Sequence, residues 1–242
     1  MPYTTVTVGA VDNQAAGGNL APGQPSGTGG VLFLVAATRG TSVTLSDPTG
    51  YTPSGDTTSG VVPTIGTWLR FATDDANDLV DTDIFSGTSY ASAVILRLTG
   101  DIWDGAIGSI LNQAVVTVAT EADTADIPTG ALTISPETSD VMSIAVGAKI
   151  KGSSQDGVTF TPPTGLTEAV DDCPDGSTLC LQVAYDLSAG NLSADVFDQD
   201  ASHEHDDPSS SIILVLKPAA GGGVAPTGNI YGPLGGPFRG VI

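Results

Sequence analysis

The feature that most constrains this chain is the dense interruption of short apolar runs by glycine and proline. The 242 residues include 31 glycines and 16 prolines, and long helices do not tolerate so many helix-breaking residues. The runs between them are rich in valine, isoleucine and threonine, whose branched Cβ atoms suit a pleated, half-buried surface. The sequence therefore predicts an all-β chain made of strands joined by turns.

The strands can be placed approximately from these runs. Thr4–Val8 and Leu181–Tyr185 alternate with a period of two, as expected when one face of a strand is buried. Many short strands separated by turn signals favour an antiparallel β-sandwich or a jelly-roll-like core. Residues 109–122 are the best candidate for a helix, although the valine-rich stretch 115–118 argues for a strand there. We expect strands near residues 3–11, 30–38, 41–46, 64–73, 90–99, 130–135, 141–150, 166–170, 180–188, 191–198 and 211–217.

Three segments differ in composition. Residues 1–29 combine a first strand with a Gly/Pro-rich stretch, residues 30–218 form the sandwich core, and residues 219–242 are again rich in glycine and proline. Within the core, the order of elements in 30–100 is repeated in 141–217. This pattern indicates either an internal duplication, with a period of about 110–115 residues, or the chance similarity that any sandwich produces. A duplicated chain could form one sandwich or two lobes.

The last segment carries apolar side chains at intervals, which is unusual for a disordered tail. They follow the flexible Gly221–Gly223 joint and are Ile230, Tyr231, Leu234, Phe238 and Ile242. Spaced apolar residues on an extended chain are typical of a segment that docks on another protein. We call residues 219–242 the docking arm and expect these side chains to be buried in neighbouring subunits.

The charge of the chain restricts its partners. It has 27 acidic and only seven basic residues, a net charge of −20. Such a charge repels phosphate backbones and anionic lipids, so we expect neither nucleic acid nor a membrane as a partner. No apolar run is long enough to span a bilayer. The first residues lack the basic and apolar stretch of a secretion signal, so we expect synthesis in a cytoplasm.

Two acidic stretches are candidate metal sites. Asp74, Asp75 and Asp78 offer the hard oxygen ligands that calcium prefers, although the spacing departs from the EF-hand pattern. His203 and His205 would share one face of a strand and could bind a transition metal. Both stretches also suit solvated acidic loops, and we expect no resident cofactor.

Catalytic and redox motifs are weak. No Gly-x-Ser-x-Gly motif has a suitably placed histidine partner, and acidic pairs are too abundant to indicate glycoside hydrolysis, so the sequence favours a non-enzymatic protein. Cys173 and Cys180 flank a predicted turn. They could form a disulfide or remain two thiols.

Five motifs occur in a recognisable order. They are Pro48-Thr49-Gly50-Tyr51, Trp68-Leu69-Arg70-Phe71-Ala72, Ala93-Val94-Ile95-Leu96-Arg97-Leu98-Thr99-Gly100, Pro162-Pro163-Thr164-Gly165-Leu166-Thr167-Glu168 and Leu214-Val215-Leu216-Lys217-Pro218-Ala219. Over about residues 30–220 this layout resembles a family of structural proteins of tailed-phage and prophage virions with a β-sandwich core. The resemblance implies a virion or tail-region protein and transfers no catalytic residue.

These observations lead to a functional expectation. We expect a capsid decoration (cement) or head-spike protein, made in the host bacterial cytoplasm and bound to the major capsid protein or other virion proteins on the virion surface. A homo-oligomer is expected, with a trimer favoured. The alternatives are a tail component, either tube-decorating or fibre-associated, and a carbohydrate- or receptor-binding module.

Overall fold

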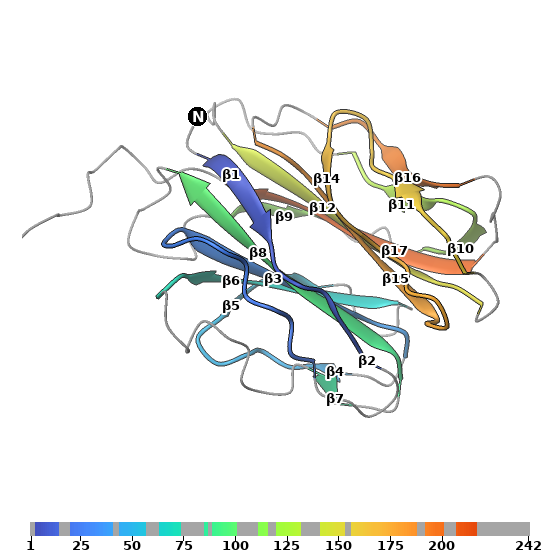
Figure 1. The fold of residues 1–242 in the computed structure, drawn as a ribbon. Helices are drawn as coiled ribbons and strands as arrows, with labels where there is room; N and C mark the ends of the chain where they lie inside the picture. The colour runs from blue at the N-terminus through green and yellow to red at the C-terminus, as the bar shows by residue number, and fades with distance from the viewer. Residues whose placement is uncertain are drawn as a thin grey trace, which may run out of the picture.

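The fold is a two-sheet antiparallel β-sandwich (Figure 1). The computed structural model describes residues 3–14, 20–40, 44–56, 63–73, 85–86, 89–100, 111–115, 120–131, 141–152, 156–187, 192–200 and 207–216. Every regular element in these ranges is a β-strand, and all strand pairs are antiparallel. The predicted fold class is therefore confirmed.

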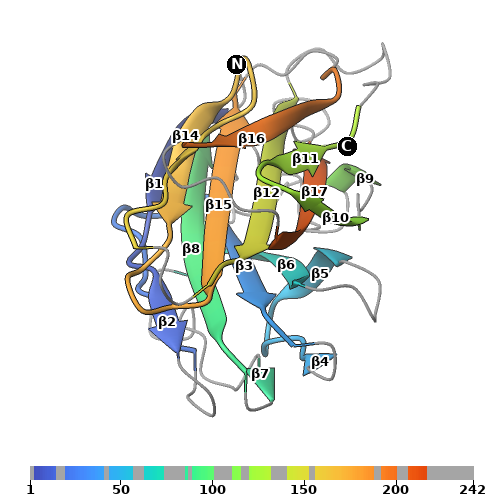
Figure 2. The same cartoon turned by 90° about the vertical axis from the view of Figure 1, so that its right-hand side faces the viewer.

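The first sheet is built from the N-terminal part of the chain. Its order is β1 (Tyr3–Val8), β8 (Ala91–Gly100), β3 (Val31–Thr38), β6 (Thr64–Phe71) and β5 (Thr52–Asp56), and β2 (Asp12–Gln14) pairs with the other end of β8. The short strands β4 (Thr44–Leu45) and β7 (Phe85–Ser86) pair at one end of this sheet (Figure 2).

The second sheet is built from the C-terminal part. Its order is β10 (Thr120–Thr124), β17 (Asp207–Leu216), β12 (Met142–Ile150), β15 (Leu179–Asp186) and β14 (Thr167–Asp172), and β9 (Leu111–Val115) pairs with the other end of β17. A small third sheet, with the order β11 (Ile127–Thr129), β16 (Asp195–Gln199) and β13 (Phe160–Thr161), lies over the outer face of the second. Figure 2 shows β16 crossing the strands beneath it.

The two large sheets have the same internal plan. Two short strands share one side of β8 in the first sheet and of β17 in the second, and the order of the remaining strands matches. Both β5 and β14 have a bulge after their second residue. Both follow a Pro-Thr-Gly turn closed by the same hydrogen bond, and the glycine of each turn has a positive φ, 79° in Gly50 and 85° in Gly165. The sequence echo between 30–100 and 141–217 thus falls on strands in equivalent places.

The main core lies between the facing sheets. It takes alternate residues from the central strands, such as Phe33 and Leu96 from the first sheet and Ile144 and Leu214 from the second, all of them fully buried. Burying one such side chain stabilises a fold by about 1.5–3 kcal/mol. Because both parts of the chain contribute to one core, the two sheets form one structural unit.

The outer faces of both sheets are buried as well. Leu20, from the segment between β2 and β3, packs with Trp68 on the outside of the first sheet. Phe197 of β16 packs with Ala184 on the outside of the second. This covering explains why the central strands are continuous apolar runs, since a sheet with one wet face has alternating polar residues. All eight residues of β3 are buried.

Two local expectations were wrong. Residues 111–115 and 120–124 are strands, not parts of a helix over 109–122, because both pair with the free edge of β17. A strand that was not expected lies at Ile127–Thr129, where it pairs with β16. Of the strand expected at 130–135, residues 130–131 are not in a strand, and the remainder lies outside the described residues. In both places pairing with a distant strand decides the structure, which local sequence does not reveal.

Candidate functional site

The site residues expected from the sequence lie outside the described residues. This applies to the calcium candidates Asp74, Asp75 and Asp78, and to the histidine pair His203 and His205. It also applies to the docking-arm residues Ile230, Tyr231, Leu234, Phe238 and Ile242. Among the described residues, no group of three or more histidine, cysteine or acidic side chains could hold a metal ion. The remaining candidates are the hollows and the buried charges of the described residues.

Three of the five basic side chains in the described ranges are buried. Arg97, Lys149 and Lys151 are only 2 %, 1 % and 2 % exposed, although basic residues are rarely buried in proteins. Arg39 and Arg70 lie nearer the surface. Arg39 donates a hydrogen bond to Thr178, and the Arg70 guanidinium lies over the Tyr51 ring. Little positive charge is therefore left on the described surface of this acidic chain.

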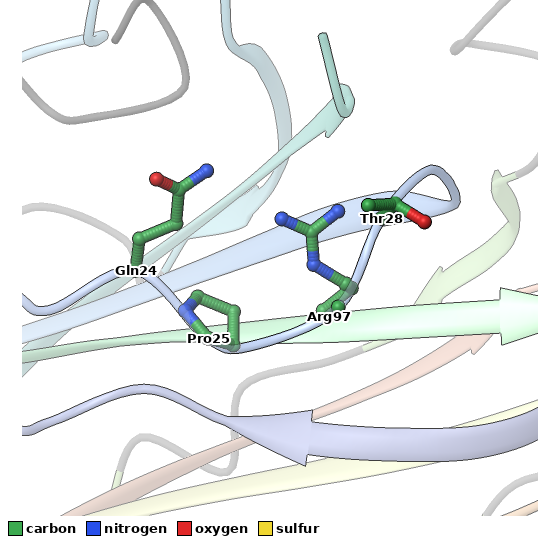
Figure 3. Close-up of a pocket in the computed structure, with 5 residues that line it drawn as sticks. Gln24, Pro25, Thr28 and Arg97 are labelled. Carbon is green, nitrogen blue, oxygen red and sulfur yellow. The ribbon is translucent and has the colours of Figure 1, made fainter. Parts of the chain in front are cut away.

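Arg97 lies at a small hollow on the outside of the first sheet (Figure 3). The hollow has a volume of about 210 Å³ and is lined by Gln24, Pro25, Gly27, Thr28 and Arg97. The Arg97 Nη1 donates a hydrogen bond of 2.7 Å to the carbonyl oxygen of Gly29. Since that carbonyl belongs to the loop before β3, Arg97 fastens this loop to β8, which is a structural role.

Lys149 has a similar role beneath the small third sheet, which covers the outer face of the second sheet. Its Nζ donates to the Gln199 Oε1 at 2.7 Å and to the carbonyl oxygen of Ala125. Gln199 ends β16 and Ala125 precedes β11, so one buried ammonium joins two covering segments to β12. A buried charge needs such partners to offset its lost hydration. Lys149 therefore has a structural role too.

The larger of the two hollows lies beside the small third sheet, on the outside of the second sheet. Its volume is about 370 Å³. Apolar side chains from three segments contribute to it, namely Leu166, Leu192 and Ile213, and Asp195 lies at its polar side. We call it the outer pocket. The remaining lining residues are Thr129, Pro163, Thr164, Ser193 and Ala194.

Asp195 gives the outer pocket a fixed negative charge. The backbone N–H groups of Thr164 and Val196 donate to its two carboxylate oxygens at 2.8 and 3.0 Å. These bonds, together with one to the Thr164 side chain, lower the pKa of Asp195 below its usual range because they stabilise the carboxylate. A hollow with apolar side chains on one side and an ionised carboxylate on the other suits an occupant that has an apolar part and a positive group.

A second group of carboxylates lies on the edge strand β14. Burial raises the pKa of Asp172, and the neighbouring charge of Asp171 raises it further, while a 2.7 Å hydrogen bond from the Asn13 Nδ2 opposes the shift. Burial and Asp171 also raise the pKa of Glu168. The Asn13–Asp172 bond joins the edge of one sheet to the edge of the other, so this group has a structural explanation.

Cys173 and Cys180 form a disulfide. It closes the turn between β14 and β15, beside the pair Asp172–Leu181. The sequence left open whether these cysteines are bridged or two thiols. A disulfide suits a protein that spends its working life in an oxidising environment.

The outer pocket was missed from sequence because its lining comes from loops and strands far apart in the chain. The one available signal was the comparison of the two echoing halves, which differ in aromatic content at matched positions. No helix in the described part of the chain is long and apolar enough to cross a membrane. Comparisons with known proteins found no matching family model, curated protein or solved structure. The resemblance to virion proteins therefore rests on the sequence motifs.

Proposed function

We propose that the chain is a structural protein of a tailed-phage virion, a capsid decoration or head-spike protein that binds the capsid surface through its docking arm. The supporting observation is that the strands before residue 217 already complete and cover both large sheets. The last described strand, β17, lies inside the second sheet between β12 and the pair β9 and β10, and it ends at Leu216. The apolar residues of the docking arm thus follow a core with both large sheets already covered.

The character of the sandwich supports a passive, durable role. It has one core shared by two sheets, outer faces that are also packed, and basic side chains turned inward. Such a module exposes few apolar side chains, and Val8 is the one large apolar side chain that is exposed in the described part. The acidic surface keeps free copies soluble and apart, so that attachment depends on a dedicated segment.

The number of copies per particle tests this proposal. Particles from the host that carries this gene are purified, and the chain is quantified against the major capsid protein by mass spectrometry. A decoration protein is expected in hundreds of copies, and a head spike in a smaller number fixed by capsid symmetry. Absence of the chain from purified particles would contradict the proposal.

Two alternatives predict other results. A tube-decorating tail protein would also be abundant but would remain with tails after heads and tails are separated, whereas a fibre-associated protein would be present in a handful of copies. A carbohydrate- or receptor-binding module is supported by one observation, the outer pocket with its hydroxyl and carboxylate groups. Glycan binding by the purified chain at micromolar concentration would favour this module.

A further inference from the structure

The outer pocket reaches, at Ile213, a row of residues that is less bulky than the equivalent row of the first half. On the outer face of each large sheet, three residues lie side by side on neighbouring strands. They are Ile95, Leu34 and Trp68 in the first sheet, and Ile213, Ala145 and Ala184 in the second. The equivalent row thus contains two methyl groups where the first half has an isobutyl group and an indole.

The turn beside this row shows a similar difference. Tyr51 follows the Pro-Thr-Gly turn of the first half and is 7 % exposed, whereas Leu166 follows the equivalent turn in the second. The small residues of the row share a cluster with Phe197 of β16, whose ring also lies against Gly147 in the middle of β12. The outer pocket remains open between Leu166 and Ile213. One wall of the outer pocket, Leu166, therefore stands where the first half has the larger, aromatic side chain of Tyr51.

This comparison and the charge of Asp195 describe the occupant. It should present an aromatic ring to Leu166, Leu192 and Ile213, and a positive group to the Asp195 carboxylate. A ring buried against aliphatic side chains gains hydrophobic stabilisation, and a cation beside a carboxylate adds direction. A peptide in which an aromatic residue is followed by a basic one meets both requirements.

The docking arm contains such a pair. Phe238 is followed by Arg239, the only basic residue of the arm, in a chain with seven basic residues. Phe238 lies 22 residues beyond Leu216, the end of the strand that carries Ile213. An extended chain of that length spans up to about 75 Å, which is enough to reach the same pocket on an adjacent molecule.

We propose that the outer pocket binds Phe238 from the docking arm of a second copy of this chain, with Arg239 facing Asp195. This inference rests on the proposed function, because it assigns the docking arm of one copy to a receptor on its neighbour. The contact is heterologous, because it joins the docking arm of one copy to a different surface on the next. Copies joined in this way form a closed ring only if the rotation between neighbouring copies is a whole fraction of a full turn. The trimer expected from the sequence is one such closed ring.

Self-association of the full-length purified chain tests the proposal. Sedimentation velocity over a range of concentrations is compared for the unchanged chain, for Phe238→Ala and for Leu166→Tyr, which puts into the wall of the pocket the residue found at the equivalent place in the first half. Both variants are expected to weaken association at least about tenfold, as loss of a central aromatic contact does. Asn229→Ala, a polar change in the same segment, is the matched control and should leave association unchanged.

A second measurement covers the case in which Leu166→Tyr disturbs the fold. A synthetic peptide of residues 229–242 is added in excess to the full-length chain and should dissociate its oligomers, whereas the same peptide with Phe238→Ala should not. Association that is unaffected by Phe238→Ala, or a chain that stays monomeric at high concentration, overturns the inference. The proposed function is tested separately, because it is contradicted only if purified particles lack the chain. Failure of the inference and failure of the proposed function are therefore distinguishable.

Discussion

Leu96 and Leu214 offer a matched pair of substitutions that tests whether the two halves fold as one unit. They occupy equivalent positions on β8 and β17, both are fully buried, and both belong to the core between the sheets. Leu→Ala removes three carbon atoms, which corresponds to about 2.4 kcal/mol of transfer free energy. The cavity left behind raises the expected loss to about 3–5 kcal/mol.

The assay is urea unfolding of each variant, followed by tryptophan fluorescence and by far-ultraviolet circular dichroism. Each substitution should lower the free energy of unfolding by a similar amount, with one transition seen by both probes. Val8→Ala is the control. Val8 is 40 % exposed, so its truncation should cost less than about 0.5 kcal/mol.

The reasoning is refuted if unfolding proceeds in two separate transitions, with Leu96→Ala shifting one and Leu214→Ala the other. That result would mean two independent lobes. Hydrogen bonds across the sandwich argue against it. Asn13 donates to Asp172 at 2.7 Å, and the Ser210 hydroxyl donates to the carbonyl oxygen of Pro63 at 2.6 Å.

Three further substitutions test local features by thermal or urea unfolding. Replacing Cys173 and Cys180 by alanine should lower the free energy of unfolding by about 2.5 kcal/mol, which is the entropy that closing an eight-residue loop removes from the unfolded chain. If the replacement leaves the stability unchanged under oxidising conditions, the disulfide is absent. Gly165→Ala and Gly50→Ala should each lower the free energy of unfolding by about 1–2 kcal/mol for their left-handed backbone. The costs should be similar, since a Cβ at Gly165 meets nothing and a Cβ at Gly50 meets only the end of the flexible Arg70 side chain; no loss of stability at either glycine would contradict this. Asp172→Asn should stabilise the chain at pH 7 by less than about 1 kcal/mol after solvent screening. The folded pKa of Asp172 lies above its unfolded value, so ionisation of this carboxyl destabilises the fold as the pH rises through the folded pKa. The stability gained by Asp172→Asn should therefore vanish below about pH 3.8, where Asp172 is protonated in both states. A gain in stability that persists below that pH would contradict burial of the charge as its cause.

The central strands were predictable because burial on both faces leaves a clear mark in sequence. Val31–Thr38 and Met142–Ile150 are nearly continuous apolar runs, and their predicted spans agree with β3 and β12 within a residue or two. The edge and covering strands were harder. Residues 111–115 and 120–124 are polar or mixed and become strands because β17 offers them a partner.

The sites depend even more on tertiary structure. Nothing local marks Lys149 or Arg97 as buried, since their positions in β12 and β8 could equally project a charge into water. The outer pocket is lined by residues from segments far apart in the chain, and the difference between its Leu166 and Tyr51 of the other half is visible only once the two halves are aligned strand by strand. The metal candidates and the docking-arm contacts remain predictions from sequence.

Occupancy of particles by a truncated chain tests the central claim most directly. Particles are assembled with the full chain or with a chain lacking residues 219–242, and the bound copies are counted by quantitative mass spectrometry after purification. The account predicts that the truncated chain is expressed in folded form but is nearly absent from particles. Full occupancy without the docking arm would show that the sandwich itself makes the attachment, and would contradict the account.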